Sequence, residues 1–171
     1  MSAMPRSVTM RGKPLTLTGK PVKVGDLAPD FTGIDANLDV FRFHDHQGKV
    51  FVLSAVPSID TSVCDKETRR FNELAADLDP NVEIITLSMD LPFALKRWCG
   101  ATGVDRVRLL SDHREASFGQ NYGVLIEELR LLARAVFVVD REGKISYIEV
   151  VPEIAQEPDY DKVLEAVKAA L

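Results

Sequence analysis

The stretch VFVLSAVPSIDTSVCDKETRRFNELA, Val50 to Ala75, contains the elements that decide the fold class. Residues 50–56 form a nearly continuous apolar run, which is typical of a central strand covered on both faces. Pro57 ends this run. Apolar residues then recur at helical spacing, at Phe71, Leu74, Ala75 and Leu78. The stretch therefore predicts a buried strand, a short loop and an amphipathic helix.

Other strands and helices alternate along the chain in the same manner. Strands are predicted over 82–89, 107–110, 133–140 and 144–151, with a tight turn at 141–143 that pairs the last two antiparallel. One helix begins after Asp90, which could cap it, carries Pro92 in its first turn and ends at Gly100. A second begins near Tyr160 and places Val163, Leu164, Val167 and Leu171 on one face. The order predicts an α/β fold with a central mixed sheet flanked by helices.

The N-terminal residues predict a separate element. Apolar and polar residues alternate around RGKP, residues 11–14, which is typical of a β-hairpin. We expect one domain over residues 1–171, with the hairpin as an extension over about residues 1–22.

Composition and charge narrow the class of protein. The chain has 171 residues, of which 46% are hydrophobic and 27% charged, enough apolar material for a full core. Its net charge of −5 disfavours nucleic acid or an anionic membrane as a partner, because both bind concentrated positive charge. No segment approaches the roughly 18 apolar residues of a membrane span, and the N-terminus has no secretory apolar block. We expect a cytoplasmic protein.

The chain has only two cysteines, and one of them lies where the predicted helix begins. Cys64 stands two helical turns before Phe71, so its side chain should point to the covered face. Thr61 or Ser62 could cap this helix, and free N–H groups at a helix N-terminus favour a thiolate. The Thr61 hydroxyl could point at the same sulfur, while Pro57 could hold the loop over it.

The charged residues that follow Cys64 are expected to face water. Asp65 and Glu67 fall in the first turn, where acids are favourable, and the segment CDKETRR, residues 64–70, mixes charges as a solvated helix face does.

Several functions could use a cysteine in this place. It could be a small buried hydrophobe. The C-x5-R spacing to Arg70 would suit phosphoryl transfer, but carboxylates inside the loop would repel a phosphate. A metal site would require both cysteines to meet two of the three histidines, which the spacing does not favour, so His44, His46 and His113 are expected at the surface.

Thiol chemistry on a peroxide fits the two cysteines best. A thiolate attacks one oxygen of an O–O bond, becomes a sulfenic acid, and is resolved by a second thiol. Cys64 and Cys99 are 35 positions apart on different predicted helices, and no C-x-x-C pair is present. The scheme requires no cofactor and no metal.

Four motifs in order resemble the thiol peroxidase branch of the peroxiredoxin family. They are PSIDTSVCDKETRRFNELA, SMDLPFALKRWCG, LLARAVFVVD and EPDYDKVL, and P-x-x-x-T-x-x-C in the first is similar to the peroxidatic motif. The resemblance runs from about Ser7 to the C-terminus. It implies a thioredoxin-like fold with an N-terminal hairpin and a homodimer.

The resemblance also implies roles for individual residues. Cys64 corresponds to the peroxidatic cysteine, Thr61 and Pro57 to its loop, and Arg134 to the active-site arginine, while Cys99 stands in the place of the resolving cysteine. The implied function is reduction of hydrogen peroxide and small organic hydroperoxides, with recycling by thioredoxin. The alternative is a peroxide-sensing relay or chaperone that uses the same disulfide.

Ionisation of the thiol would not by itself explain fast peroxide reduction. Full ionisation of an ordinary thiol at neutral pH gains at most ~30-fold, about 2 kcal/mol. We therefore expect Arg134, the N–H of Cys64 and the Thr61 hydroxyl to stabilise the leaving oxygen. The plainer alternatives are a salt bridge to the side of a helix for Arg134 and core packing beside Trp98 for Cys99. Disulfide formation requires Cα atoms within roughly 7 Å, so both helix ends should unwind locally.

Overall fold

The computed structural model describes residues 4–75 and 77–171 of the chain. In this part of the chain the main sheet has the strand order β11-β10-β5-β6-β7-β3-β4. The strands are β3 (Thr32–Ile34), β4 (Val40–Arg42), β5 (Val50–Ala55), β6 (Val82–Ser88), β7 (Arg108–Ser111), β10 (Ala135–Val139) and β11 (Ile145–Val150). Strand β5 pairs parallel with β6 and antiparallel with β10, and β10 pairs antiparallel with β11. The predicted mixed α/β sheet of thioredoxin-like type is confirmed.

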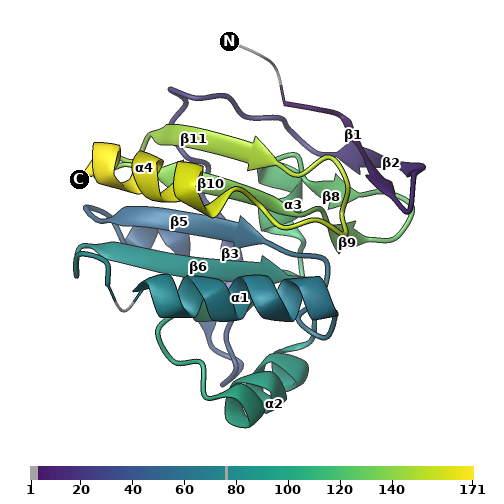
Figure 1. Cartoon of the computed structure of the whole chain (residues 1–171), viewed down its shortest axis with the longest axis horizontal. Coiled ribbons are helices and arrows are strands. Elements are labelled where there is room, and N and C mark those ends of the chain that lie inside the picture. Colours follow the sequence, from purple (N-terminus) through teal and green to yellow (C-terminus); the bar gives the residue numbers. More distant parts are fainter. Residues whose placement is uncertain (1–3, 76) are drawn as a thin grey trace.

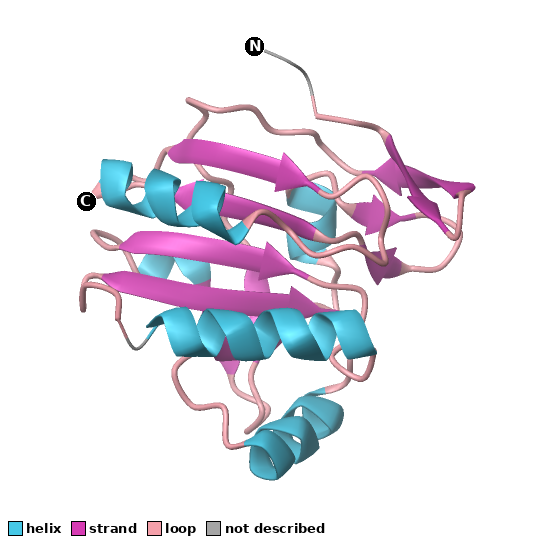
Figure 2. Ribbon diagram, in the orientation of Figure 1, coloured by secondary structure: helices cyan, strands magenta, loops and turns pink. Residues whose placement is uncertain are grey.

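Helices cover both faces of this sheet (Figures 1 and 2). They are α1 (Ser62–Ala75), α2 (Pro92–Thr102), α3 (Ser117–Asn121) and α4 (Tyr160–Ala170), with a 3-10 turn η1 (Phe43–Asp45). Helices α1 and α4 lie in front of the sheet in Figure 1, and α3 lies behind it. Among the described helices, none combines the length and apolar character needed to cross a bilayer.

Strand β5 contributes to both hydrophobic layers because its side chains alternate. Val50 and Val52 belong to the layer beneath α1, α2 and α4, while Phe51 and Leu53 pack in the layer that includes α3. Every residue of β5 is buried, as the apolar run predicts. Its rigid position fixes where the following loop and α1 begin.

The predicted N-terminal hairpin is confirmed, and it belongs to a second, smaller sheet. Strands β1 (Ser7–Met10) and β2 (Lys13–Thr18) pair antiparallel and continue through β8 (Leu125–Ile126) to β9 (Leu131–Leu132). Thr9 N–H also donates to the Pro152 carbonyl at 2.8 Å, and Ile154 N–H donates to the Thr9 carbonyl at 2.9 Å. The hairpin is thus bonded to the segment after β11. That residues 1–171 form one domain stays a prediction.

The predicted boundaries of α2 are wrong at both ends. Its N-cap is Leu91 without a side-chain hydrogen bond, because the Asp90 carboxylate is engaged elsewhere. The helix passes through Gly100 and ends at Thr102, where Gly103 adopts a φ of 71° and its N–H donates to the Cys99 carbonyl. Glycine lowers helix stability without forbidding a helix, and the left-handed cap falls on the later glycine. Cys99 therefore lies inside the last turn of α2.

Helix α4 begins at Tyr160 as predicted, with one difference in its covered face. Asp159 caps it by accepting from Lys162 N–H at 3.2 Å. Val163 and Val167 are buried, but Leu171 follows the last helical residue and is exposed. The end of α4 extends beyond the edge of the sheet (Figure 1). The helical spacing of apolar residues therefore continues to Leu171, where the sheet no longer covers the side chain.

Candidate active site

Four of the residues named by the sequence motifs, Pro57, Thr61, Cys64 and Arg134, come together beyond the carboxyl end of β5, whereas Cys99 lies in α2. Pro57 is buried two residues after the strand, and α1 begins five residues later. A cavity of about 310 Å³ opens here, with Met10 of the hairpin, Pro57, Thr61, Arg134 and Ile154 in its lining. A crevice at the carboxyl ends of parallel strands is the usual place for a ligand in an α/β sheet. Most of the lining is apolar.

The sulfur of Cys64 is linked to this cavity through Arg134, which lines it. Its side chain has no exposed surface, and its Sγ atom accepts a hydrogen bond from Nη2 of Arg134 at 3.3 Å. Among the described residues, the backbone N–H of Cys64 has no hydrogen-bond acceptor. A cationic donor and a free N–H of the first helical turn thus both favour a thiolate at this atom.

Arg134 is buried and bound on three sides. It is 2% exposed and lies immediately before β10. Its Nε donates to the Ile154 carbonyl at 2.9 Å, its Nη1 lies 3.4 Å from Oε1 of Glu67, and its Nη2 faces the sulfur. The alternative, a salt bridge to the side of a helix, is also present, because Nη1 pairs with Glu67 of α1. The guanidinium does more than this, since its fork is shared between backbone, carboxylate and thiol.

Glu67 is a buried partner that the sequence prediction placed in water. Glu67 and Thr68 have no exposed surface, so the predicted solvated face is wrong at these two positions. Oε2 of Glu67 accepts from the Ser54 hydroxyl at 2.9 Å. Burial raises the pKa of Glu67 to about 7, although Arg134 and Ser54 oppose the rise. Spacing could have revealed this, since Cys64, Glu67 and Phe71 fall on one helix face.

Glu67 should make the stability of the fold depend on pH. Its pKa of about 7 lies above the 4.5 of an ordinary glutamate, so the folded protein binds more protons than the unfolded chain between these values. Stability therefore falls as pH rises from about 4.5 through about 7 and stays lower above that, by about 3 kcal/mol. Glu67→Gln keeps an acceptor for Ser54 but cannot titrate. Between pH 5 and 8 the unfolding free energy of wild type should therefore fall by about 2 to 3 kcal/mol more than that of the variant.

Urea unfolding of the reduced proteins at several pH values measures this effect. Glu165→Gln, on the exposed side of α4, is the matched control and should follow the wild-type curve. Equal pH dependence in the Glu67→Gln variant and the wild type would contradict the assignment.

Thr61 does not point its hydroxyl at the sulfur in this structure. Its carbonyl accepts the first helical hydrogen bond, from Asp65 N–H at 2.9 Å, so Thr61 occupies the N-cap position. Its hydroxyl donates to the Ser58 carbonyl at 2.9 Å instead. Thr61 lines the cavity, so its hydroxyl oxygen can accept a hydrogen bond from a bound molecule, whereas donation to a leaving oxygen would require the bond to Ser58 to break.

Asp90 holds the loop before α1 in place, a role the sequence prediction missed. Its carboxylate accepts from the Ser58 hydroxyl, from Ile59 N–H and from the Ser88 hydroxyl, each at 2.7 Å. These bonds join the loop to the end of β6. They explain why Asp90 does not cap α2.

Cys99 is half-buried, and both cysteines are free thiols. It packs against the layer beneath α1, α2 and α4, and burial raises the pKa of its thiol. Cys99 in this position is therefore less reactive than an exposed thiol. Unwinding of the last turn of α2 would remove the burial that suppresses its ionisation.

Side chains next to each cysteine tie α2 to α1. Nε1 of Trp98 donates to Oδ1 of Asp65 at 2.7 Å, and Nε of Arg69 donates to Oδ2 of the same carboxylate at 2.9 Å. Arg97 binds both carboxylate oxygens of Asp60, at 2.9 and 3.0 Å. Because Asp65 follows Cys64 and Trp98 precedes Cys99, the Trp98–Asp65 hydrogen bond holds the two segments that carry the cysteines in their present positions.

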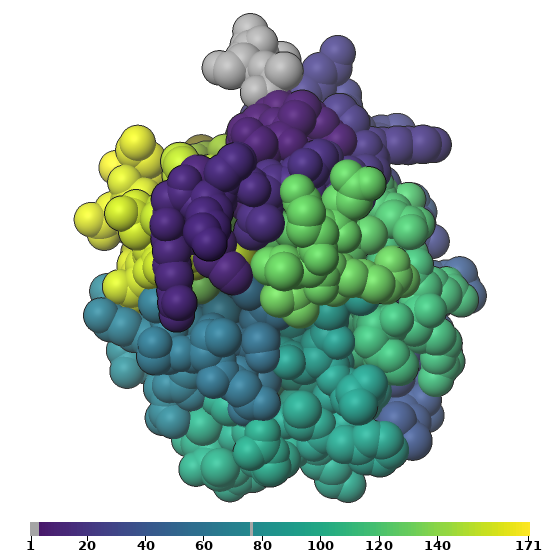
Figure 3. All heavy atoms as spheres, turned by 90° about the vertical axis from the view of Figure 1, so that its right-hand side faces the viewer, coloured from purple at the N-terminus to yellow at the C-terminus, as the bar shows by residue number. Residues whose placement is uncertain are grey.

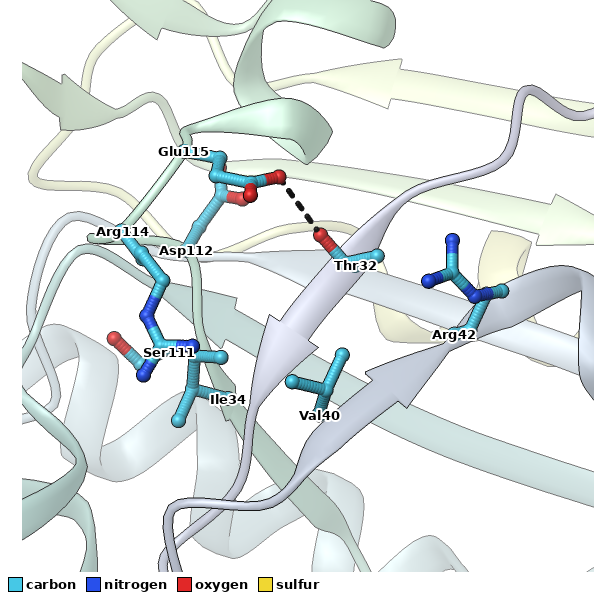
Figure 4. A pocket seen from close by; sticks show the side chains of 8 residues that line it. All are labelled: Thr32, Ile34, Val40, Arg42, Ser111, Asp112, Arg114 and Glu115. Carbon is cyan, nitrogen blue, oxygen red and sulfur yellow. Dashed lines mark hydrogen bonds between the residues drawn. The ribbon is translucent and has the colours of Figure 1, made fainter.

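A second cavity, of about 360 Å³, contains none of the predicted site residues. Figure 4 shows it between β3, β4 and the segment after β7, with Thr32 donating to Glu115 at 3.3 Å. Arg42 and Arg114 lie at its edges, both exposed. No group of three or more histidine, cysteine or acidic side chains in the described residues is arranged to hold a metal ion.

The chain is similar to known proteins over nearly its whole length. The family model described as Redoxin matches residues 23–164. A thiol peroxidase of Oceanobacillus iheyensis is 60% identical over 158 residues, covering 92% of this chain and 96% of its own. A thiol peroxidase of Bacillus subtilis is 56% identical over 162 residues, covering 95% and 96%. A crystal structure of a peroxiredoxin-like protein from Aquifex aeolicus has a TM-score of 0.93 at 42% identity, covering 99% of this chain and all of that one.

A thioredoxin-like sheet with a buried thiol beside a buried arginine defines a thiol-based oxidoreductase. The chain belongs to the redoxin family, and within it to the thiol peroxidase branch of the peroxiredoxins. It is a peroxidase that reduces peroxide at the expense of a thiol reductant.

Proposed function

We propose that Cys64 is the peroxidatic cysteine and Arg134 its principal catalytic partner, acting on hydrogen peroxide and small organic hydroperoxides. The Sγ thiolate attacks one peroxide oxygen, an S–O bond forms and the O–O bond breaks. The peroxide proton moves to the departing oxygen, which leaves as water or alcohol, and the Cys64 sulfenate takes one proton from solvent to become a sulfenic acid. The observation that carries this proposal is the 3.3 Å contact between Arg134 Nη2 and Cys64 Sγ in a buried site.

The departing oxygen requires donors that are already in place. Arg134 lines the cavity and faces the sulfur, so one guanidinium can contact both the thiolate and a peroxide entering from the cavity. The free N–H of Cys64 is a second donor. Thr61 accepts the peroxide O–H and orients it, and Pro57 closes the cavity over the loop. Donors fixed before the reaction stabilise developing charge most effectively.

Resolution follows with Cys99 as the second thiol. The Cys99 thiolate attacks the sulfenic sulfur, an S–S bond forms, and hydroxide leaves and is protonated to water. A dithiol reductant of thioredoxin type then supplies two electrons and two protons. Gly100 inside α2 lowers the local helix stability by about 1 kcal/mol relative to alanine, which favours unwinding.

We also propose that the enzyme is a homodimer in the cytoplasm, where thiol reductants are abundant.

Non-reducing mass spectrometry after one equivalent of hydrogen peroxide tests the assignment. We expect a loss of two mass units and a peptide pair that links Cys64 to Cys99. A stable sulfenic acid without that link would refute the resolving role of Cys99. Rapid oxidation combined with slow turnover by a thioredoxin system would instead favour a signalling relay, and gel filtration tests the dimer.

The Trp98 contact should control the speed of resolution. Trp98→Phe keeps an aromatic ring but removes the donor to Asp65, so α2 should open more often. A charge-assisted hydrogen bond of about 1.5 kcal/mol corresponds to roughly tenfold faster disulfide formation. Quenched-flow mass spectrometry measures the disulfide rate, and the rate of Cys64 oxidation should stay within twofold of wild type. Arg108→Lys is the control, because Arg108 pairs with Glu83 on the surface. An unchanged rate of disulfide formation in Trp98→Phe would show that the Trp98–Asp65 hydrogen bond does not control resolution.

A further inference from the structure

Asp90 joins three parts of the fold with one side chain. Oδ1 of its carboxylate accepts from the Ser58 hydroxyl, and Oδ2 accepts from Ile59 N–H and from the Ser88 hydroxyl, each at 2.7 Å. Ser58 and Ile59 belong to the loop before α1, and Ser88 is the last residue of β6. The Asp90 carbonyl also accepts from the Ser111 hydroxyl of β7. This one residue therefore fixes the loop, the ends of two strands and the start of α2 relative to one another.

The charge of this carboxylate is held by neutral groups. No side-chain nitrogen of a described lysine, arginine or histidine lies within 4.0 Å of the Asp90 oxygens. The residue is half-buried, so its three donors replace much of the water that would otherwise surround the anion. Hydrogen bonds to an ionised group are stronger than those between neutral groups. Loss of one donor should therefore loosen the contact on that side of the carboxylate.

The loop that Asp90 holds forms part of the cavity wall. Pro57, Ser58 and Thr61 line the cavity of about 310 Å³ that Arg134 also lines, whereas Asp90 does not. The Ser58 carbonyl accepts from the Thr61 hydroxyl at 2.9 Å and from Thr61 N–H at 3.2 Å. Because Thr61 is the N-cap of α1, the position of Ser58 determines where Thr61 and the first turn of the helix lie.

The same loop lies against α2. Figure 3 shows the blue segment around residue 60 beside the teal segment of α2, and Arg97 of α2 binds the Asp60 carboxylate at 2.9 and 3.0 Å. Ile59 is buried in the same hydrophobic layer as Trp98. Movement of the start of α2 away from the loop would therefore break the bonds between Asp90 and the loop.

We propose that Asp90 is a positioning residue with opposite effects on the two chemical steps. It holds the loop before α1 in place while peroxide reacts with Cys64, and its release from that loop is part of the opening that brings Cys99 to the oxidised sulfur. This inference rests on the proposed function of the two cysteines. Because Asp90 does not line the cavity, it acts through Ser58 and Ile59 rather than on the peroxide itself.

Two serine variants separate this role from general stabilisation of the fold. Ser58→Ala removes the hydroxyl that reaches Asp90 from the loop, and Ser88→Ala, the matched control, removes the hydroxyl that reaches it from β6 at the same distance. Asp90→Asn keeps the size of the side chain and removes its charge at a position outside the cavity. Quenched-flow mass spectrometry with one equivalent of hydrogen peroxide measures the rates of sulfenic acid and disulfide formation, and urea unfolding measures stability.

The expected result is a change of opposite sign in the two rates. Ser58→Ala and Asp90→Asn should each form the sulfenic acid about tenfold more slowly and the disulfide about tenfold faster, the factor expected for one hydrogen bond to a charged group. The double variant should differ little from either single variant, because both changes break the same contact. Ser88→Ala should keep both rates within twofold of wild type, although it should lose at least as much stability as Ser58→Ala, since Ser88 is 2% exposed.

Equal rate changes in Ser58→Ala and Ser88→Ala, or unchanged rates in both, would overturn the positioning role of Asp90. Slower oxidation in Ser58→Ala without faster disulfide formation would overturn its part in the opening. The two serine variants give this answer even if Asp90→Asn does not fold. Failure of wild type to form a sulfenic acid at Cys64, or to link it to Cys99, would instead overturn the proposed function.

Discussion

Arg134→Lys is expected to slow the oxidation of Cys64 by hydrogen peroxide about 100-fold. Lysine keeps the positive charge but has one ammonium group, which cannot donate at once to the Ile154 carbonyl, Glu67 and the sulfur in the arrangement of the guanidinium. Loss of one preorganised donor to a developing oxyanion costs about 10²- to 10³-fold in rate. The second-order rate constant from stopped-flow fluorescence measures the effect.

The result must be separated from loss of structure. Arg134 is buried beside Glu67, so the variant should be compared with wild type by urea unfolding at the same pH. Arg108→Lys is a matched control on the surface, where the arginine binds Glu83 at 2.7 Å, and should react at the wild-type rate. A folded Arg134→Lys variant that reacts as fast as wild type would show that the guanidinium does not stabilise the leaving oxygen.

Cys99→Ser is expected to lower steady-state peroxidase turnover with a thioredoxin system by about 100-fold or more. An intramolecular thiol acts at an effective concentration far above that of a dilute external thiol, so its loss leaves the sulfenic acid to slow intermolecular attack. The first oxidation of Cys64 should stay within twofold of wild type, because Cys99 lies in α2 and makes no contact with Arg134 or the sulfur among the described hydrogen bonds.

Two rates measured on one preparation distinguish the outcomes. NADPH consumption reports turnover, and quenched-flow mass spectrometry reports the first oxidation. In the variant, Cys64 should accumulate as sulfenic acid and then as sulfinic acid at excess peroxide. Undiminished turnover in Cys99→Ser would mean that another thiol resolves Cys64. Glu165→Gln, on the exposed side of α4, serves as the control that leaves both thiols in place.

Local patterns predicted β5, β6, β7, β10 and β11 and helices α1, α2 and α4, because these elements depend on residues close in sequence, but they did not identify α3, β8 or β9. The apolar run 50–56 and the break at Pro57 place β5 and α1, and the turn before Lys144 pairs β10 with β11. The ends of α2 were the least predictable: Gly100 and Gly103 are both able to end a helix, and the difference depends on backbone angles that neither residue type dictates.

Some features of the active site depend on residues that are neighbours in sequence, and others depend on residues that only the fold brings together. The sequence by itself determined that Cys64 stands at a helix start behind Pro57, because strand, turn and helix are neighbours along the chain. Only the tertiary structure brought Arg134 to that sulfur across 70 positions, buried Glu67 against the same guanidinium, and turned the Thr61 hydroxyl to Ser58. The charge pattern around Glu67 matches a solvated helix face, and the buried guanidinium of Arg134, distant in sequence, offsets part of the cost of burying it.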